Sequence, residues 1–241
     1  MRVTRLLCAA AVAAITAVPA AAATLTHAYD FGASSGGFVL DSVGSADGAL
    51  LNGASVASGA LVLDGGDDYV QFGEKIVATG GPFSVFMRVE FLQNLQGITE
   101  LISQGSSGGP GFYIGENGGG GFRIGDFAPN PGFAVPAVGG FHDLLFTYGA
   151  GSLSFSIDNG AAFTTGFGGF TTGGADTRLG HQFCCGEYFH GRYDVVKTFD
   201  GVATYAEATA GGIPEPQAWA LMIAGFFGLG AVLRRRATVP T

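Results

Sequence analysis

Acidic side chains in one glycine-containing segment are the first residues of this sequence whose types and spacing suggest chemistry. Asp64, Asp67 and Asp68 fall within five positions. Carboxylate oxygens are the ligands that Ca²⁺ takes in proteins, so this cluster is a candidate calcium site, and calcium is the one candidate cofactor. Aspartates in turns also accept hydrogen bonds from nearby amides, which needs no metal. Both readings stay open, and they extend to three aspartates nearer the N-terminus: Asp30, Asp41 and Asp47.

Two adjacent cysteines form the second candidate. Cys184 and Cys185 are flanked by His181 and His190. In an oxidising compartment the two cysteines either form a vicinal disulfide or stay as free thiols. A zinc site is disfavoured because its cysteines are normally separated by at least two residues, and because adjacent side chains on a strand point to opposite faces. A disulfide between Cys184 and Cys185 is therefore one expectation for this pair, and free thiols are the other.

Aromatic residues around the cysteines are the candidate ligand contacts. Phe183, Tyr188 and Phe189 lie in this segment, and an exposed ring can stack on the face of a sugar. Most of the 21 phenylalanines follow the apolar alternation of strands and are expected in the core. The single tryptophan, Trp219, lies near the C-terminus. This segment is therefore the predicted polysaccharide platform.

The glutamates do not form a glycosidase pattern. Glycoside hydrolysis needs two carboxylates that face one cleft. Glu90, Glu100, Glu116 and Glu187 stand far apart, and no Glu-x-Asp-x-x-Glu or His-Glu-x-x-His sequence occurs. The chain is therefore expected not to be an enzyme.

The segments that must position these residues have an apolar period of two rather than 3.6. Apolar residues alternate with polar ones in 83–91, and again in 153–157 before Asp158-Asn159-Gly160. Such alternation is typical of half-buried strands, and Asp-Asn-Gly is typical of a hairpin turn. Further strands are expected at 25–31, 60–63, 68–72, 111–114, 122–124, 141–148 and 193–199.

Composition supports many short strands joined by glycine turns. The chain has 43 glycines, 47% hydrophobic residues and only 12% charged residues, and no amphipathic helix is evident between its two end segments. The run Gly118–Gly121 lacks the residues that follow in a phosphate loop, so we expect a hairpin tip there. The predicted fold class is all-β, a two-sheet antiparallel jelly-roll sandwich.

The charge balance bears on the class of partner. The formal net charge is −8, and residues 24–213 contain 6 Lys and Arg against 18 Asp and Glu, a balance of −12. An acidic body repels nucleic acid and anionic lipid surfaces. Nucleic acid is therefore excluded as an expected partner.

The N-terminal residues 1–23 have the three parts of a secretory signal peptide. Arg2 and Arg5 precede an apolar run at 6–18, and small residues at 21–23 suit cleavage before Thr24. Cys8 precedes most of the apolar run, so it is not a lipoprotein cysteine. We expect export through the inner membrane by the secretion machinery.

The C-terminal segment reads as a membrane-crossing tail. The prolines of Ile213-Pro214-Glu215-Pro216 break the chain, residues 218–233 carry no charge, and Arg234, Arg235 and Arg236 follow. A helix of these 16 residues would be about 24 Å long, somewhat short of the ~30 Å hydrocarbon core. Arginines after the helix favour a cytoplasmic end, so the body would face the periplasm.

This tail resembles the PEP-CTERM sorting segment of Gram-negative bacteria. The residues that carry the resemblance are Pro214, Glu215, Pro216, Trp219, the Gly/Phe-rich span, Arg234, Arg235 and Arg236, in this order. The resemblance implies recognition by a membrane-embedded exosortase and processing near the Pro-Glu-Pro motif. It also implies a place beside exopolysaccharide or biofilm production. A plain single-pass anchor is the alternative.

The body resembles the laminin-G-like, concanavalin A-like jelly roll of bacterial surface proteins. The segments on which this resemblance rests are, in order, 61–70, 83–85, 101–105, 141–144 and 191–196. Family members often have tryptophan where Met87 and Phe141 stand, so the match is to a divergent branch. The resemblance implies the sandwich fold that the alternation also predicts.

Together these features predict four regions. They are a signal peptide at 1–23, a sandwich at 24–210, a linker at 211–217 and a transmembrane helix with arginine cluster at 218–236. The expected protein is membrane-anchored as a precursor and, when mature, lies at the cell surface or in the extracellular matrix, where it binds polysaccharide or a surface partner. The alternatives are an exopolysaccharide-active hydrolase or lyase and a purely structural matrix component.

Overall fold

A computed structural model describes residues 22–210 apart from positions 33, 94–96, 106–110, 126–129, 172, 175 and 183–184. The predicted linker, transmembrane helix and nearly all of the predicted signal peptide therefore lie outside the described residues. Within the described part, no helix has the length and apolar character needed to span a membrane.

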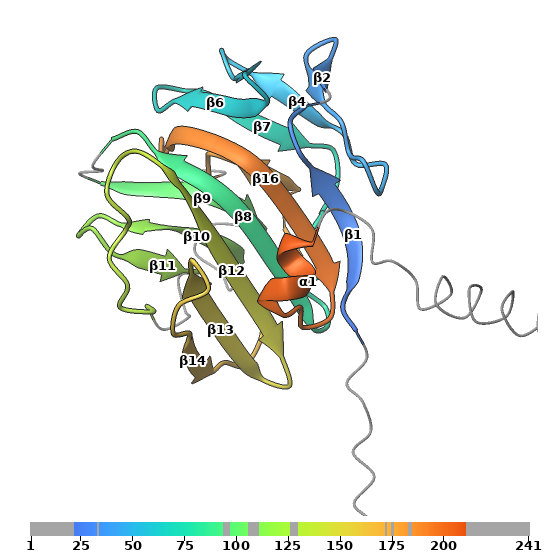
Figure 1. Ribbon diagram of the computed structural model, residues 1–241, viewed down its shortest axis with the longest axis vertical. Coiled ribbons are helices and arrows are strands. Elements are labelled where there is room, and N and C mark those ends of the chain that lie inside the picture. The colour runs from blue at the N-terminus through green and yellow to red at the C-terminus, as the bar shows by residue number, and fades with distance from the viewer. Residues whose placement is uncertain are drawn as a thin grey trace, which may run out of the picture.

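Two antiparallel sheets pack face to face, as the alternation predicts (Figure 1). Sheet A runs in the order β14 (Phe163–Gly166), β13 (Ser152–Ile157), β12 (Phe141–Gly149), β8 (Phe83–Phe91), β16 (His190–Asp200), β6 (Ala60–Asp64) and β5 (Ser55–Ala57), and β1 (Thr24–Tyr29) also pairs with β16. Sheet B runs in the order β11 (Phe122–Ile124), β10 (Phe112–Asn117), β9 (Ile98–Gln104), β15 (Thr177–Leu179), β7 (Tyr69–Phe72), β4 (Gly48–Leu51), β3 (Phe38–Val39) and β2 (Ser34–Ser35).

Strand β8 shows why the chain folds this way. Phe83 and every second residue to Phe91 are fully buried between the sheets, while Arg88 and Glu90 point to the other face. Burying each large apolar side chain contributes about 1.5–3 kcal/mol. A register shift of one residue would turn this whole row to solvent, so the pattern specifies the pairing.

The predicted turn at Asp158-Asn159-Gly160 is confirmed. Asp158 and Asn159 both have positive φ, 50° and 56°, as a type I′ turn between β13 and β14 requires. The glycine run at 118–121 also lies at a strand connection, between β10 and β11.

A short helix that the sequence did not predict covers part of the outer face of sheet A. This helix, α1 (Tyr205–Thr209), begins with a capping box in which Thr204 and Glu207 satisfy each other's backbone amides. Buried Lys197 of β16 donates hydrogen bonds to the carbonyls of Ala208 and Ala210. Five residues are too few to show a helical period, which is why the pattern missed it.

Candidate functional site

A row of polar side chains crosses the outer face of sheet B. The register pairs Tyr113 with Ser103, Ser103 with Arg178, and Arg178 with Gln71. Directly paired residues share a face. Their neighbours along each strand, such as Ile114, belong to the core cluster, so the row points away from the core. The row continues through Ala49 to Phe38, whose side chain is 45% exposed.

Arg123 joins two carboxylates beside this row. Its guanidinium Nη2 contacts Glu100 Oε1 and donates to Glu187 Oε2 at 2.8 Å. Glu100 lies over Gly115, where an added Cβ would meet its Oε2 at 2.4 Å, so glycine is required there. Burial by itself would lower the pKa of Arg123. The negative charges of Glu100 and, less strongly, Glu187 outweigh burial, so the pKa of Arg123 is raised. Three elements are thereby tied together: β9, β11 and the segment before β16.

The segment 180–189, which we call the strap, runs along sheet B from the end of β15 to the start of β16. The amide of Gly180 donates to the Leu101 carbonyl, and the amide of Glu100 donates to the Glu187 carbonyl. Ser103 Oγ donates to the His181 carbonyl at 2.7 Å. The described strap residues are therefore held to β9 by backbone and side-chain hydrogen bonds at both of their ends.

A ladder of stacked groups lies where the strap meets β7 and β15. The Arg178 guanidinium is 4.8 Å from the Tyr69 ring centre, and Tyr69 is 5.3 Å from His181. His181 stacks on Tyr188 at 4.1 Å with an interplanar angle of 16°. Tyr69, Arg178 and Tyr188 are half-buried, whereas His181 is buried. Burial, with Arg178 as a second cause, lowers the pKa of His181 to about 4, so its ring is neutral near pH 7.

The structure gives Tyr188 and Phe189 of the predicted platform different places. Tyr188 contributes to the ladder. Phe189 is 0% exposed and packs against Phe91 and Tyr193 in the core, so it cannot offer a face to a ligand and the prediction is corrected there. Phe183 lies outside the described residues. The ladder partners Tyr69 and Arg178 were missed. Tyr69 lies on β7, more than 100 residues before the strap, and Arg178 lies on the short strand β15, which the alternation did not predict.

Cys185 is disulfide-bonded. The other two cysteines of the chain, Cys8 and Cys184, both lie outside the described residues, so the vicinal pairing with Cys184 stays a prediction.

The aspartates at 64–68 serve the turn between β6 and β7. Asp68 Oδ2 accepts from the Asp64 amide at 3.1 Å, and Asp64 Oδ1 accepts from the Gly66 amide at 2.7 Å. Burial is the main reason why the pKa of Asp68 is raised. Across the described ranges no group of three His, Cys, Asp or Glu side chains is arranged to hold a metal ion. These contacts supply the turn-stabilising role, and calcium at Asp64, Asp67 and Asp68 stays a prediction.

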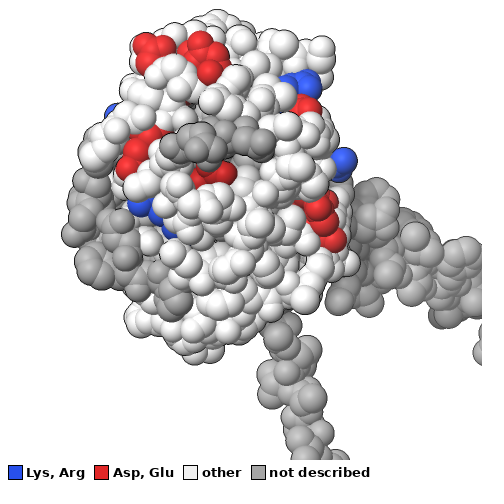
Figure 2. Space-filling view, turned by 90° about the vertical axis from the view of Figure 1, so that its left-hand side faces the viewer, with Lys and Arg blue, Asp and Glu red and all other residues white. Residues whose placement is uncertain are grey.

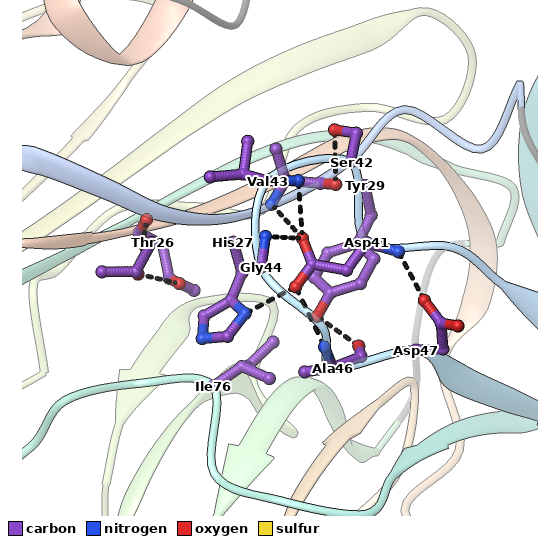
Figure 3. Close-up of polar contacts among 12 residues, drawn as sticks. Thr26, His27, Tyr29, Asp41, Ser42, Val43, Gly44, Ala46, Asp47 and Ile76 are labelled. Atoms are coloured by element: carbon purple, nitrogen blue, oxygen red, sulfur yellow. Dashed lines mark hydrogen bonds and ion pairs between the residues drawn. The ribbon is translucent and has the colours of Figure 1, made fainter.

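Asp41 is the centre of a second polar cluster, which closes the loop after β3 (Figure 3). Its carboxylate is fully buried and accepts five hydrogen bonds: from His27 Nδ1 at 2.7 Å and from the amides of Ala28, Val43, Gly44 and Ala46. Burial alone would raise the pKa of Asp41, but the bonds from His27 and the amides hold it below its usual range. An ionised carboxylate only accepts, so His27 carries its proton on Nδ1. Both oxygens are therefore occupied by the protein itself.

Charged side chains are sparse on one face of the molecule. On the face shown in Figure 2 most of the surface is uncharged, with acidic and basic side chains in small separate groups. Phosphate-backbone binding requires many Lys and Arg side chains gathered on one surface, and this face lacks such a basic patch.

Comparisons with known proteins agree with the fold. A family model described as the concanavalin A-like lectin/glucanases superfamily matches residues 64–209, more than half of the chain. A search of curated protein sequences found no match.

Sialidase structures share the sandwich at low sequence identity. A Trypanosoma rangeli sialidase in complex with 2,3-difluoro-KDN superposes with a TM-score of 0.60 and 14% identity, over 79% of this chain and 32% of that one. A mutant of this sialidase displaying trans-sialidase activity gives 0.61 and 13%, over 76% and 32%. Domain 4 of a GH43 extracellular arabinanase from Geobacillus stearothermophilus, in complex with arabinotriose, gives 0.49 and 21%, over 78% and 98%. The chain spans about a third of the length of the sialidases.

Proposed function

Because the chain belongs to the concanavalin A-like lectin/glucanases superfamily, we propose that its sandwich is a non-catalytic module that binds polysaccharide outside the cell. The observation that carries this proposal is the ladder on the outer face of sheet B. Two half-buried tyrosine rings, Tyr69 and Tyr188, lie beside the polar row that runs to exposed Phe38. Aromatic faces with hydrogen-bonding groups around them suit a sugar chain.

Binding without catalysis is supported by the position of Arg123. A glycosidase needs the space between its two carboxylates for the glycosidic bond and, in inverting enzymes, for a water molecule. Here the Arg123 guanidinium contacts both Glu100 and Glu187 and so occupies that space. These two carboxylates and Arg123 therefore link the strap to β9 and β11.

Replacing Tyr188 by alanine tests the platform. We expect at least about tenfold weaker binding of a neutral polysaccharide, because the ring that stacks on His181 is lost from the ladder. Pull-down and titration with purified neutral exopolysaccharides measure the effect. Phe141→Ala is the matched control, since Phe141 is a half-buried aromatic residue of β12, which belongs to sheet A.

Three outcomes separate the candidate functions. Binding without release of reducing ends supports the binding module. Release of reducing ends would favour the exopolysaccharide hydrolase or lyase, and neither binding nor release would favour a purely structural matrix component. Unaltered binding by a folded Tyr188→Ala protein would remove the platform.

The sorting part of the proposal comes from the sequence of the tail. We propose that an exosortase recognises Pro214-Glu215-Pro216 with the apolar segment and arginine cluster behind it, and that the module thereby reaches the cell surface or matrix. Exchanging both prolines of this motif for alanine should make the full-length, membrane-bound precursor accumulate. Immunoblotting of membrane and medium fractions measures this, and Pro240→Ala, beyond the arginine cluster, is the control. Normal processing of the double variant would contradict sorting through this motif.

A further inference from the structure

A hollow of about 380 Å³ lies at the end of the sandwich, away from the ladder residues. Three connections meet there: the turn before β8, the β12–β13 hairpin, and the segment after β14. Its wall contains five glycines, and we call it the glycine-walled hollow: Gly80, Gly81, Gly151, Gly168 and Gly169. None of the described residues that line it carries a charge, so it offers no ionic partner.

Tyr148 supplies the aromatic wall of this hollow. Its ring packs against Phe83 at 5.8 Å and Phe170 at 5.6 Å, which fixes its orientation. Its hydroxyl makes no hydrogen bond to any residue that the structure describes, and it lies 3.2 Å from the position that a Cβ at Gly169 would take. A rigid ring therefore presents an unused donor and acceptor at the hollow.

The fold does not require glycine at two positions of the wall. Gly81 and Gly168 have ordinary φ, and an added Cβ at either position would meet nothing within 4 Å. An alanine at such positions usually stabilises a protein by restricting the unfolded chain. What glycine does provide here is open space and exposed backbone beside Tyr148.

A second hollow of about 530 Å³ shares the residues of the turn before β8 with the first. Gly80, Gly81 and Pro82 line both hollows, and Asp200 also lines the second.

From these features we infer that the glycine-walled hollow is a second carbohydrate site, which takes an uncharged oligosaccharide segment. An uncharged wall excludes anionic ligands as the preferred class, and the volume is near the lower end of small-ligand sites. The Tyr148 ring stacks on one sugar, its hydroxyl bonds a sugar hydroxyl, and the glycine backbone allows close approach. The inference rests on the proposed function but uses none of the ladder residues.

Two sites on one chain have a consequence for the matrix. A molecule that holds one polysaccharide strand at the ladder and another at the hollow links the two strands, and binding of a long polymer gains from the high effective concentration at the second site.

The experiment titrates the full chain, purified in detergent, with neutral gluco-, manno-, galacto- and arabino-oligosaccharides. We expect calorimetry to give two bound oligosaccharides per chain. Gly81→Leu should fill the hollow and leave one, and Tyr148→Phe should weaken the same site by about tenfold through the lost hydrogen bond. Gly73→Leu is the matched control, because Gly73 also has ordinary φ and open space for a Cβ but does not line the hollow.

The outcomes distinguish the two proposals. Tyr188→Ala should also leave one site, and the double variant with Gly81→Leu should leave none. If the folded Gly81→Leu protein still binds two oligosaccharides, the proposed site at the hollow would be overturned, but the proposed site at the ladder would not. If the unmodified chain binds only one oligosaccharide, and Gly81→Leu abolishes this binding while Tyr188→Ala does not, the proposal that the ladder binds sugar would be overturned instead. No binding of any oligosaccharide by the unmodified chain would overturn both.

Discussion

Replacing Asp41 by asparagine is expected to lower the free energy of unfolding by about 3 kcal/mol. The Asp41 carboxylate is fully buried and accepts four backbone amides and His27 Nδ1. Asparagine keeps one acceptor oxygen and turns an NH₂ group toward donors, so the side chain can no longer accept all five hydrogen bonds, two of which come from the amides of the buried residues Ala28 and Ala46. Urea unfolding at pH 7 measures the change.

An exposed aspartate provides the control for Asp41. Asp30 Oδ1 accepts only the Gly32 amide at the surface, so Asp30→Asn should change stability by no more than about 0.5 kcal/mol. The pH dependence gives a second readout. The pKa of Asp41 is lower in the folded state than in the unfolded state. Its contribution to the free energy of unfolding is therefore present above the unfolded-state pKa of about 3.9 and is lost as the pH falls through the folded-state pKa. Equal stability of the two variants at pH 7 would refute the role of Asp41.

Replacing Glu116 by glutamine should stabilise the protein at pH 8 by up to about 3 kcal/mol. Glu116 is 1% exposed, and its Oε2 is buried without a hydrogen-bond partner. Its direct cross-strand partner, Thr99, has a buried hydroxyl that is also unpaired. Burial raises the pKa of Glu116 to about 7, so at pH 8 the folded protein must hold an unsolvated charge.

The sign of this effect depends on pH. Below the unfolded pKa of about 4.3 both states carry the proton and Glu116 imposes no cost. As the pH rises through the folded pKa of about 7 the full cost develops, so wild-type stability falls over this range relative to Glu116→Gln. Urea unfolding at pH 4.5 and pH 8 measures the difference, with exposed Glu74→Gln as the control. The same advantage at both pH values would show that the carboxyl group is not titrating.

Asp41 and Glu116 lie toward opposite ends of sheet B, and only Asp41 is expected to affect binding. Asp41 closes the loop that carries β3 into β4, and this loop places Phe38 at the far end of the polar row. Glu116 lies on β10 beside Gly115, over which Glu100 reaches Arg123. A folded Asp41→Asn protein should therefore bind polysaccharide more weakly at the sheet B face, whereas the pH-dependent cost at Glu116 is a stability effect.

Local pattern was enough to predict the sandwich and the strands with clear alternation, such as β8 and β13, but it did not predict β9 (Ile98–Gln104) or short strands such as β4 and β15. In 83–91 each apolar residue was assigned to the correct face, because a strand's period of two ties burial directly to position. The turn at Asp158-Asn159 followed from residues that tolerate positive φ. Family resemblance added the concanavalin A-like identity of the body, which the match over 64–209 bears out.

Irregular segments and long-range pairings were beyond the reach of such patterns. The strap has no period, so nothing in its letters indicated that Phe189 turns into the core while Tyr188 stays at the surface. Glu100 and Glu187 seemed isolated, yet both contact Arg123, because strand order and a register shift after Ile114 bring three distant segments together. Burial along a strand is a local property that residue order encodes, whereas a site on a sheet face is assembled from several strands, and only their packing brings its members within reach.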